Sequence, residues 1–203
     1  TVNFAPNSEL RSFTENPFEG ASIRSLFIPS NLEQLYGKFH NTKVNQFMVS
    51  PDNHNFQILN EKILLGKTDQ ASDNYDIVLF AYRDIVEENI PDYVRIIGPD
   101  SFSKCKRLRT LHFSDQSQLS IIDSNAFCES SLREIIIPRH VIKIGPYAFS
   151  KCKQLRTVHF SENSQLSVIG IGAFEQSSLQ SITIPSHVQE ICKCAFSNCT
   201  NLT

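Results

Sequence analysis

The chain has 203 residues, and its 19 Lys and Arg against 21 Asp and Glu give a formal net charge of −2 at pH 7. Hydrophobic residues make up 40% of the chain and charged residues 20%, a balance that is typical of folded globular proteins and excludes wholesale disorder. The net charge excludes a strongly basic nucleic-acid binder, and no apolar run approaches the roughly 18 residues that a membrane-spanning helix needs. The first residues also lack the layout of a signal peptide.

The charges are divided unequally between the two halves of the chain. Residues 1–103 carry 8 Lys and Arg against 14 Asp and Glu, whereas residues 104–203 carry 11 against 7. An acidic half joined to a basic half predicts a surface with a directional electrostatic field.

The amino-terminal segment already carries a repeat. Residues 1–35 align without a gap with residues 157–191, and apolar residues coincide at most of the apolar positions. The next strand is expected at 44–49 and the following one only at 85–91. These two predicted strands therefore start 41 residues apart, whereas elsewhere such strands recur about every 23 residues. The matched pairs are Val2 with Val158, Phe4 with Phe160, Leu10 with Leu166, Phe18 with Phe174, Ile28 with Ile184, and Pro29 with Pro185.

The long spacing in the middle of the chain contains extra apolar segments. These segments lie at 56–59, 63–65 and 77–82, and turn-prone residues separate them. Short apolar bursts between turn signals are typical of antiparallel strands. We therefore predict that residues 50–84 form an inserted β-meander that bulges from the stack of repeats.

The second half of the chain repeats regularly. Five leucines recur at intervals of 24, 23, 24 and 23 residues, and each of the first four opens the phrase Leu-x-x-apolar-x-apolar. This alternation is typical of a strand with one buried face. A unit of about 23 residues cannot bury its own apolar face, so the units are expected to stack as a parallel ladder of strands. The leucines are Leu108, Leu132, Leu155, Leu179 and Leu202.

The residues between these strands predict how the chain turns. Proline follows alternate strands and ends their hydrogen bonding, and a segment such as 141–145 is expected to turn the chain. Gly98, Gly145 and Gly170 share one column, which predicts a tight or positive-φ backbone there. A column of phenylalanines is expected on short helical turns, with the rings in the core. These residues are Phe102, Phe127, Phe149, Phe174 and Phe196.

These motifs resemble the BspA-like, Treponema-type leucine-rich repeats of bacterial and protist surface proteins. The resemblance is carried by SLREIIIPRHVIKIGPYAFSKCKQL at 131–155 and SLQSITIPSHVQEICKCAFSNCTNL at 178–202. It implies an α/β solenoid that is β-rich overall, a right-handed superhelix with a parallel β-ladder on the concave face and short helical or 3₁₀ turns opposite. We expect residues 1–203 to form a single leucine-rich-repeat domain of about eight units, a fragment of a longer array.

The histidines and cysteines are the candidates for chemistry. His112 and His159 share one column of the repeat, and His140 and His187 share another. A residue that recurs in several units more often serves the repeat than a unique active site. The chain also has no Gly-rich phosphate loop. We therefore predict no enzymatic activity and no cofactor.

Three cysteines form a further column. Cys105, Cys152 and Cys199 lie two units apart, and two strand spacings of about 4.8 Å exceed what a disulfide tolerates. They are interpreted as small buried apolar residues. Cys192 and Cys194 crowd near Cys199, but the spacing lacks a C-x-x-C pair and favours structural thiols over zinc. A bridge from Cys199 to Cys192 or Cys194 stays open, as does glycosylation at Asn198 or Asn201.

The outward-facing strand positions are the candidate binding residues. Arg109, Arg133 and Arg156 occupy one column and predict a basic stripe, because successive strands lie about 4.8 Å apart. Two interpretations remain: a solvated face, or a docking site for an acidic protein or sulfated glycan. Nucleic acid is disfavoured because no aromatic residues are interleaved with the stripe. The stripe is extended by Lys104, Lys106 and Arg107, and a neighbouring row holds His112, Ile136 and His159.

The resemblance implies a cell-surface or secreted protein that mediates adhesion to host cells or extracellular matrix. The function that we expect is therefore a non-catalytic binding module that holds a protein or sulfated glycan on its concave face. The alternative is a structural array that self-associates through its open ends and has no dedicated ligand.

Overall fold

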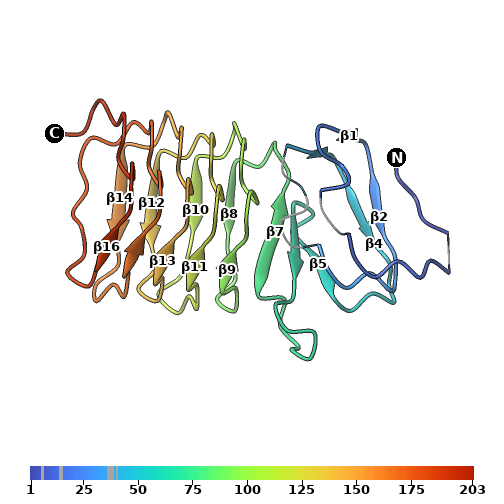
Figure 1. The fold of residues 1–203 in the computed structure, drawn as a ribbon. Coiled ribbons are helices and arrows are strands. Elements are labelled where there is room, and N and C mark those ends of the chain that lie inside the picture. Colours follow the sequence, from blue (N-terminus) through green and yellow to red (C-terminus); the bar gives the residue numbers. More distant parts are fainter. Residues whose placement is uncertain (6, 14–15, 36–38, 40) are drawn as a thin grey trace.

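The computed structural model describes residues 1–5, 7–13, 16–35, 39 and 41–203. They wind into an elongated β-solenoid of about seven turns, with the two termini at opposite ends (Figure 1). About eight units were expected. The strands are β1 (Ser22–Ile23), β2 (Leu26–Ile28), β3 (Lys43–Val44), β4 (Phe47–Val49), β5 (Phe56–Leu59), β6 (Ile63–Gly66), β7 (Ile77–Ala81), β8 (Glu87–Asn89), β9 (Ile96–Ile97), β10 (Thr110–His112), β11 (Ile121–Ile122), β12 (Glu134–Ile137), β13 (Lys143–Ile144), β14 (Thr157–Phe160), β15 (Val168–Ile169) and β16 (Glu190–Ile191).

Each regular turn from β8 to β15 contributes two strands to the solenoid. The predicted leucine-phrase strands pair in parallel, β8 with β10 and β12 with β14. The segment that was expected only to turn the chain instead contains a second strand: β9, β11, β13, β15 and β16 follow one another in parallel within an eight-stranded sheet. In β13 the side chain of Ile144 is buried and that of Lys143 is exposed. Two residues suffice for such a strand because the turns on either side hold its register.

The expected helical turns are absent from the described residues. Each phenylalanine turn has two residues with positive φ four positions apart, such as Tyr147 (56°) and Lys151 (57°). Between them the N–H of Phe149 donates to the carbonyl of Ala173 in the next turn, at 2.7 Å. Hydrogen bonds between turns thus replace the bonds within a helix and form a third ladder. The same two positions hold Asp100 and Lys104, Asn125 and Glu129, Gly172 and Gln176, and Cys194 and Asn198.

The glycine column is explained by close backbone approach and not by positive φ. A Cβ atom on Gly145 would lie 2.8 Å from the carbonyl carbon of Asp123, and one on Gly170 would lie 2.7 Å from that of Gly145. Contacts below 3.0 Å with backbone atoms leave no room for a side chain. Of the two explanations that the sequence left open, the tight backbone is therefore the one found.

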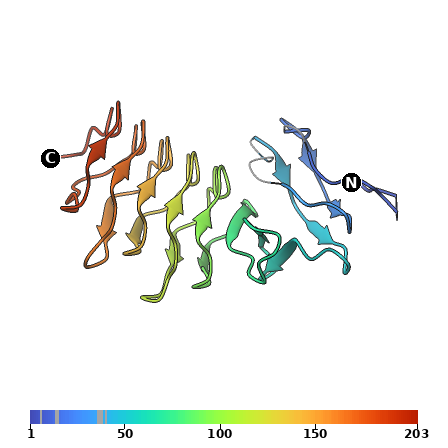
Figure 2. The same ribbon diagram turned by 60° about the horizontal axis from the view of Figure 1, so that its bottom comes forward.

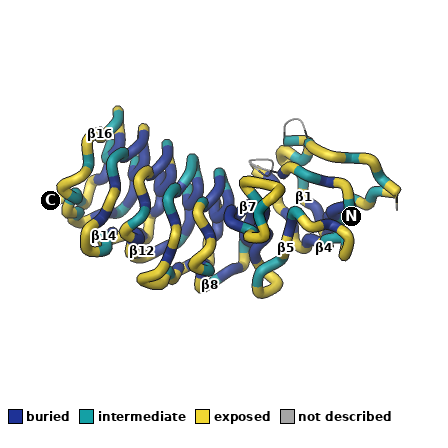
Figure 3. Tube along the Cα trace, turned by 90° about the horizontal axis from the view of Figure 1, so that it is seen from below, coloured by how far each residue is buried: buried dark blue, intermediate teal, exposed yellow. Residues whose placement is uncertain are grey.

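The phenylalanines form a continuous stack along the core. Neighbouring rings from Phe102 to Phe196 lie 5.1 to 5.4 Å apart, with planes within 15° of parallel. The first four rings are fully buried. Figure 3 shows the same burial as a dark band that runs through the regular turns. The predicted placement of these rings in the core is confirmed.

The cysteine column is also buried, as predicted. Cys152 is completely buried, and its Sγ donates to the carbonyl of Phe127 at 3.0 Å. Serines occupy the alternate turns, so that Ser130 Oγ lies 3.5 Å from Cys152 Sγ. Burial raises the pKa of the Cys152 thiol to about 12. Burial likewise raises the pKa of Cys105, so Cys105 and Cys152 fill space as neutral thiols.

The middle of the chain joins two hydrophobic cores. Strands β5, β6 and β7 pair antiparallel, and β7 continues in parallel to β9. Every residue of β6 and β7 is buried, because Ile63 and Val78 face the core of the regular turns while Leu64 and Phe80 face the amino-terminal core. The prediction that this segment bulges from the stack is wrong for these strands. Only the loop before β7, residues 67–74, extends outward (Figure 1).

The amino-terminal turns repeat the same architecture. Strand β1 pairs in parallel with β3, and β2 with β4. Two bridges, from Val2 to Leu26 and from Ser12 to Gln34, add the preceding turn, as the alignment of residues 1–35 with 157–191 predicts. The ladder that contains β2, β4, β8 and β10 is interrupted between β4 and β8. The handedness of the superhelix and the concave position of the ladder stay predictions.

Candidate functional site

The leucine phrase decides which side chains leave the solenoid. In the turn of β12, Leu132, Ile135 and Ile137 are buried, whereas the three positions between them are exposed. The same positions in successive turns build three parallel rows, which we call the outward face. The first row is Val86, Arg109, Arg133, Arg156 and Gln180, the second is Glu87, Thr110, Glu134, Thr157 and Ser181, and the third is Asn89, His112, Ile136, His159 and Thr183.

The structure brings the three predicted arginines onto consecutive turns. The N–H of Arg133 donates to the carbonyl of Arg109 at 3.2 Å, and the N–H of Arg156 donates to that of Arg133 at 2.9 Å. All three side chains are exposed, and none forms an ion pair with another described residue. Strands at a spacing of about 4.8 Å therefore hold three unpaired guanidinium groups in one row.

The third row adds an apolar residue between two imidazoles. Ile136 pairs in register with His159 and is 59% exposed, the largest exposure among the large apolar side chains described. Strand β10 lies against β12 on the other side and carries His112. The predicted row of His112, Ile136 and His159 is therefore contiguous on the outward face.

The predicted lysines contribute less to the stripe. The ammonium group of Lys106 donates to the carbonyl of Glu129 at 2.7 Å and lies 3.4 Å from its carboxylate. Lys104 donates to the side-chain carbonyl of Asn41 at 2.6 Å. Both lysines are thus engaged within the protein, which their nearness to the arginines in sequence did not indicate. Arg107 is exposed and has no ion pair with a described residue.

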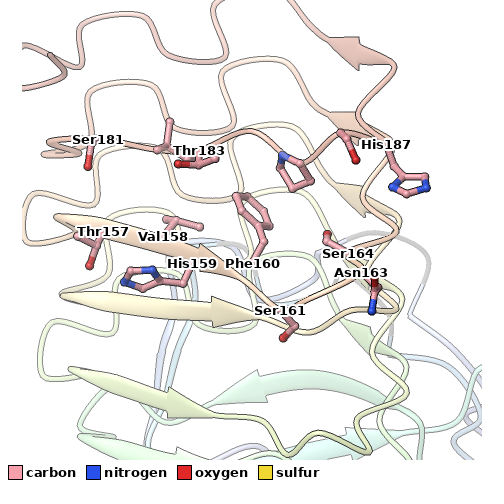
Figure 4. A pocket seen from close by; sticks show the side chains of 13 residues that line it. Thr157, Val158, His159, Phe160, Ser161, Asn163, Ser164, Ser181, Thr183 and His187 are labelled. Carbon is pink, nitrogen blue, oxygen red and sulfur yellow. The ribbon is translucent and has the colours of Figure 1, made fainter.

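A groove of about 460 Å³ adjoins the outward face at its carboxyl-terminal side. It opens because the segment after Ser181 leaves β14, to which it is joined only by a bridge from Thr157 to Ser181. His159 and His187 line the groove together with several hydroxyl groups. Figure 4 shows the ring of Phe160 extending from β14 toward the segment that carries Thr183. His159 therefore belongs to both the groove and the third row.

A second hollow region lies at the interruption between β4 and β8. Two cavities of about 680 and 450 Å³ meet there, and Asn45 and Tyr82 line both. The phenol oxygen of Tyr82 accepts a hydrogen bond from the N–H of Phe47 at 2.7 Å. The sequence does not single out Tyr82. In the sequence, the only signal for this hollow region is the 41-residue spacing. That spacing marks a break in the ladder but does not show which residues line the break.

The clustered cysteines form no bridge. All six cysteines are free thiols, so neither Cys192–Cys199 nor Cys194–Cys199 is a disulfide. The Cys192 thiol donates to the carboxylate of Glu190 at 3.3 Å, and this hydrogen bond raises the pKa of the thiol.

Within the described ranges, no three His, Cys, Asp or Glu side chains are grouped to hold a metal ion. No helix in the part of the chain that the structure describes is long and apolar enough to cross a bilayer.

Two solved structures share this fold. A leucine-rich repeat protein from Eubacterium ventriosum is 20% identical, with a TM-score of 0.61 over 93% of this chain and 62% of that one. The pneumococcal vaccine antigen PcpA is 17% identical, with a TM-score of 0.66 over 91% of this chain and 55% of that one. The chain therefore spans less than two thirds of either protein. A comparison with curated proteins found no match.

A family model matches the regular part of the chain. Residues 77–203 contain six copies of the BspA-type leucine-rich repeat region, which cover more than half of the sequence. The matched range begins at β7 and includes the whole phenylalanine stack from Phe102 to Phe196. Leucine-rich repeats are stacked modules whose extended surfaces serve interactions with other molecules. The chain therefore belongs to the BspA-type leucine-rich repeat family.

Proposed function

We propose that this chain is a non-catalytic binding module whose outward face holds an acidic protein or a sulfated glycan. The observation that supports this function is the row formed by Arg109, Arg133 and Arg156, which are exposed on consecutive turns and have no ion pair with another described residue. Three cations in one row repel one another unless solvent or a ligand offsets their charge. A partner with carboxylates or sulfates supplies that offset.

The chemistry of the row suits such anions. A guanidinium group donates two parallel hydrogen bonds to a carboxylate or sulfate, which adds directional recognition to charge attraction. The strand backbones that carry the arginines are fixed by hydrogen bonds between turns, so little backbone order is lost on binding. Ile136, exposed beside His159, offers an apolar contact next to the charged row. Glu134 in the second row limits which orientations an anionic ligand adopts.

We further propose that the protein acts at the cell surface or as a secreted protein, in adhesion to a host-cell or matrix component. The description of the pneumococcal structure as a vaccine antigen supports this setting. The extended outward face also suits attachment, because a solenoid presents many weak contacts along one line.

Binding to immobilised heparin and to polyglutamate tests the proposed face. In about 150 mM salt, the triple variant Arg109→Gln/Arg133→Gln/Arg156→Gln is expected to lose at least about tenfold in affinity for one of these probes. The matched control Arg95→Gln/Lys143→Gln/Lys193→Gln removes the same charge from exposed positions off the outward face and should stay within about twofold. Equal losses in both variants, or no loss in the first, would refute the arginine row as the binding site.

The alternative function, a self-associating array, predicts a different result. Sedimentation would then show a mass that rises with protein concentration, and the arginine variants would leave that rise unchanged. A monomer at all concentrations together with arginine-dependent probe binding supports the binding module instead.

A further inference from the structure

A buried glutamate interrupts the apolar column of the outward ladder. Glu88 pairs in register with Leu111, and the same position of the leucine phrase holds Ile135 in β12 and Val158 in β14. All four side chains are buried, and Glu88 is only 8% exposed. A carboxylate at such a position costs free energy that an apolar side chain would not. An exception of this kind is expected at a functional site.

The protein satisfies only one oxygen of this carboxylate. Oε1 of Glu88 accepts the side-chain amide of Asn60 at 2.8 Å and the N–H of Asn89 at 3.1 Å. Oε2 accepts no hydrogen bond from the described residues, and Glu88 forms no ion pair with any of them. In the described part of the chain, Ser101 Oγ is the only enclosed polar side-chain atom without a partner, so Oε2 is reachable from outside.

A pocket of about 450 Å³ gives access to Glu88. It lies between β8 and the hairpin that joins β5 to β6, where the outward ladder is broken. Figure 2 shows the amino-terminal strands, in blue and cyan, set apart from the regular ladder that begins in green. We call this cavity the glutamate pocket. Its lining residues are Asn60, Lys62, Glu87, Glu88, Asn89 and His112.

The wall of the pocket opposite β8 is a tight turn. Asn60 and Glu61 have positive φ (47° and 59°), and the N–H of Lys62 donates to the carbonyl of Leu59 at 3.0 Å. These features are those of a two-residue hairpin turn, which Asn favours at its first central position. The amide that holds Oε1 of Glu88 is therefore fixed by the backbone, and it leaves Oε2 toward the cavity.

The charges of the pocket favour a cationic ligand. Glu87 and Glu88 line it together with one cation, Lys62, which is exposed and forms no ion pair with a described residue. Glu87 is exposed and Glu88 buried, since neighbouring strand side chains point to opposite faces. Acceptors that are spread in this way suit a broad planar cation with several donors, which describes a guanidinium group.

We propose that the glutamate pocket binds the guanidinium group of an arginine side chain from the partner that lies on the outward face. Oε2 of Glu88 accepts one of its N–H groups, and Glu87 and Asn89 supply further acceptors at the rim. Glu87, Asn89 and His112 also belong to the rows of the outward face, so a ligand on that face reaches the pocket.

The pocket distinguishes between the two ligand classes of the outward face. A sulfated glycan offers anions and no guanidinium group, whereas an acidic protein can carry an arginine beside its acids. The pocket therefore selects the protein ligand. This choice rests on the function proposed above, but the affinity of the pocket for a guanidinium group does not.

A small arginine derivative tests the pocket without the arginine row. The probe is Nα-acetyl-arginine methylamide, titrated into the ¹⁵N-labelled chain and followed by NMR. Saturable shifts are expected at the amides of Asn60 and Asn89, with a dissociation constant on the order of 1 mM. The matching citrulline derivative has the same shape without the charge, and it should bind at least about fivefold more weakly.

Substitutions of Glu88 separate binding from a structural role. Glu88→Gln keeps an oxygen for Asn60 and should weaken probe binding at least about fivefold. Glu88→Leu restores the apolar column, so it should lose the probe and yet denature at the same or a higher urea concentration. The exposed acid Glu162, far along the sequence from the pocket, provides the control: Glu162→Gln should stay within about twofold. Lys62→Gln removes the nearby cation and should strengthen binding.

The proposal is overturned if the arginine derivative does not bind, if the citrulline derivative binds equally well, or if Glu88→Gln leaves the affinity unchanged. A lower urea midpoint for Glu88→Leu would likewise show that Glu88 is kept for stability. The variant Arg109→Gln/Arg133→Gln/Arg156→Gln should bind the arginine derivative within about twofold of wild type. Its binding to heparin and polyglutamate therefore decides the arginine row separately from the pocket.

Discussion

The ring of Phe149 stacks on that of Phe174 with centroids 5.2 Å apart and planes 3° from parallel. Parallel planes at this centroid distance are the offset-stacked arrangement that aromatic pairs favour, and the repeat of the backbone places each ring of the column in it. We predict that Phe149→Ala lowers the free energy of unfolding by about 3–5 kcal/mol, because it removes a fully buried ring and leaves a cavity between two turns. Urea denaturation measures this loss. Tyr147→Ala, in the same turn at a side chain 41% exposed, should cost far less.

The glycine column predicts a second effect on stability. Gly170→Ala is expected to cost about 1–3 kcal/mol, because its Cβ would lie 2.7 Å from a backbone carbon that cannot move alone. Gly20→Asn is the control. Gly20 has a φ of +72°, a Cβ added there would meet no atom within 4 Å, and Asn tolerates positive φ. Thermal melting of the two variants separates them; a stable Gly170→Ala protein would contradict the close approach.

Thiol labelling should follow burial. Cys194 is exposed and is expected to react rapidly with iodoacetamide at about pH 8, whereas Cys152 is fully buried with a pKa of about 12 and should stay unmodified until the protein unfolds. Peptide mass spectrometry after timed labelling identifies the modified residues. Modification of Cys152 at the rate of Cys194 in native protein would refute the buried cysteine column.

The same thiol predicts how stability depends on pH. The pKa of Cys152 rises from 9.0 to about 12 on folding, so above pH 9 the unfolded chain loses a proton that the folded chain keeps. Stability should therefore be unaffected by this group below pH 9 and fall between pH 9 and 12, by roughly 1.4 kcal/mol at one pH unit above the unfolded pKa of 9.0. Urea titrations at two alkaline pH values measure the slope, and Cys152→Ala should reduce it.

Arg83 anchors the start of the regular turns. Its guanidinium donates to the carbonyl of Ser101 at 2.9 Å and to that of Ala81 at 3.2 Å, and it lies over the ring of Phe80 with 4.2 Å to the centroid. We expect Arg83→Met to cost about 1.5–3 kcal/mol, because it keeps the apolar stem and removes charged donors to the carbonyls of two buried residues. The exposed Arg95→Met should change the free energy of unfolding by less than about 0.5 kcal/mol. Equal denaturation curves for both variants would show that Arg83 is dispensable.

The repeat predicts the core and the outward rows well because both depend on side-chain spacing. Leu132, Ile135 and Ile137 face inward and Arg133 faces outward simply because strand side chains alternate about a fixed phrase. The stacked phenylalanines follow from the same period. The placement of Arg109, Arg133 and Arg156 on consecutive turns could therefore be predicted from sequence alone.

The turns could not be predicted in this way. Tyr147, Lys151 and Glu129 all adopt positive φ, although their residue types carry no preference for it. Hydrogen bonds to the neighbouring turn compensate for that conformation, and those partners are visible only in three dimensions. Residue type likewise gives no indication that Lys106 is held by Glu129, since their contact joins two turns.

The middle segment forms the antiparallel strands that the sequence predicts, but the prediction that they bulge from the stack is wrong, for a related reason. Apolar residues at every position of Ile77–Ala81 indicate a strand that is buried on both faces. An amino-terminal core large enough to cover the second face is not evident from the broken register of residues 44–91. The hollow region lined by Asn45 and Tyr82 follows from the same arrangement, because the inserted strands separate β4 from β8.

The backbone bonds between phenylalanine turns have a mechanical consequence. The turn of β12 and β13, for example, is fastened to the next by two strand ladders, β12 with β14 and β13 with β15, and by bonds such as that from Phe149 to Ala173. A solenoid pulled from its two ends therefore cannot slide one turn past another without breaking all three sets together. It yields more easily by unwinding from an end, so stretching a single molecule should release one turn after another in small steps of similar length.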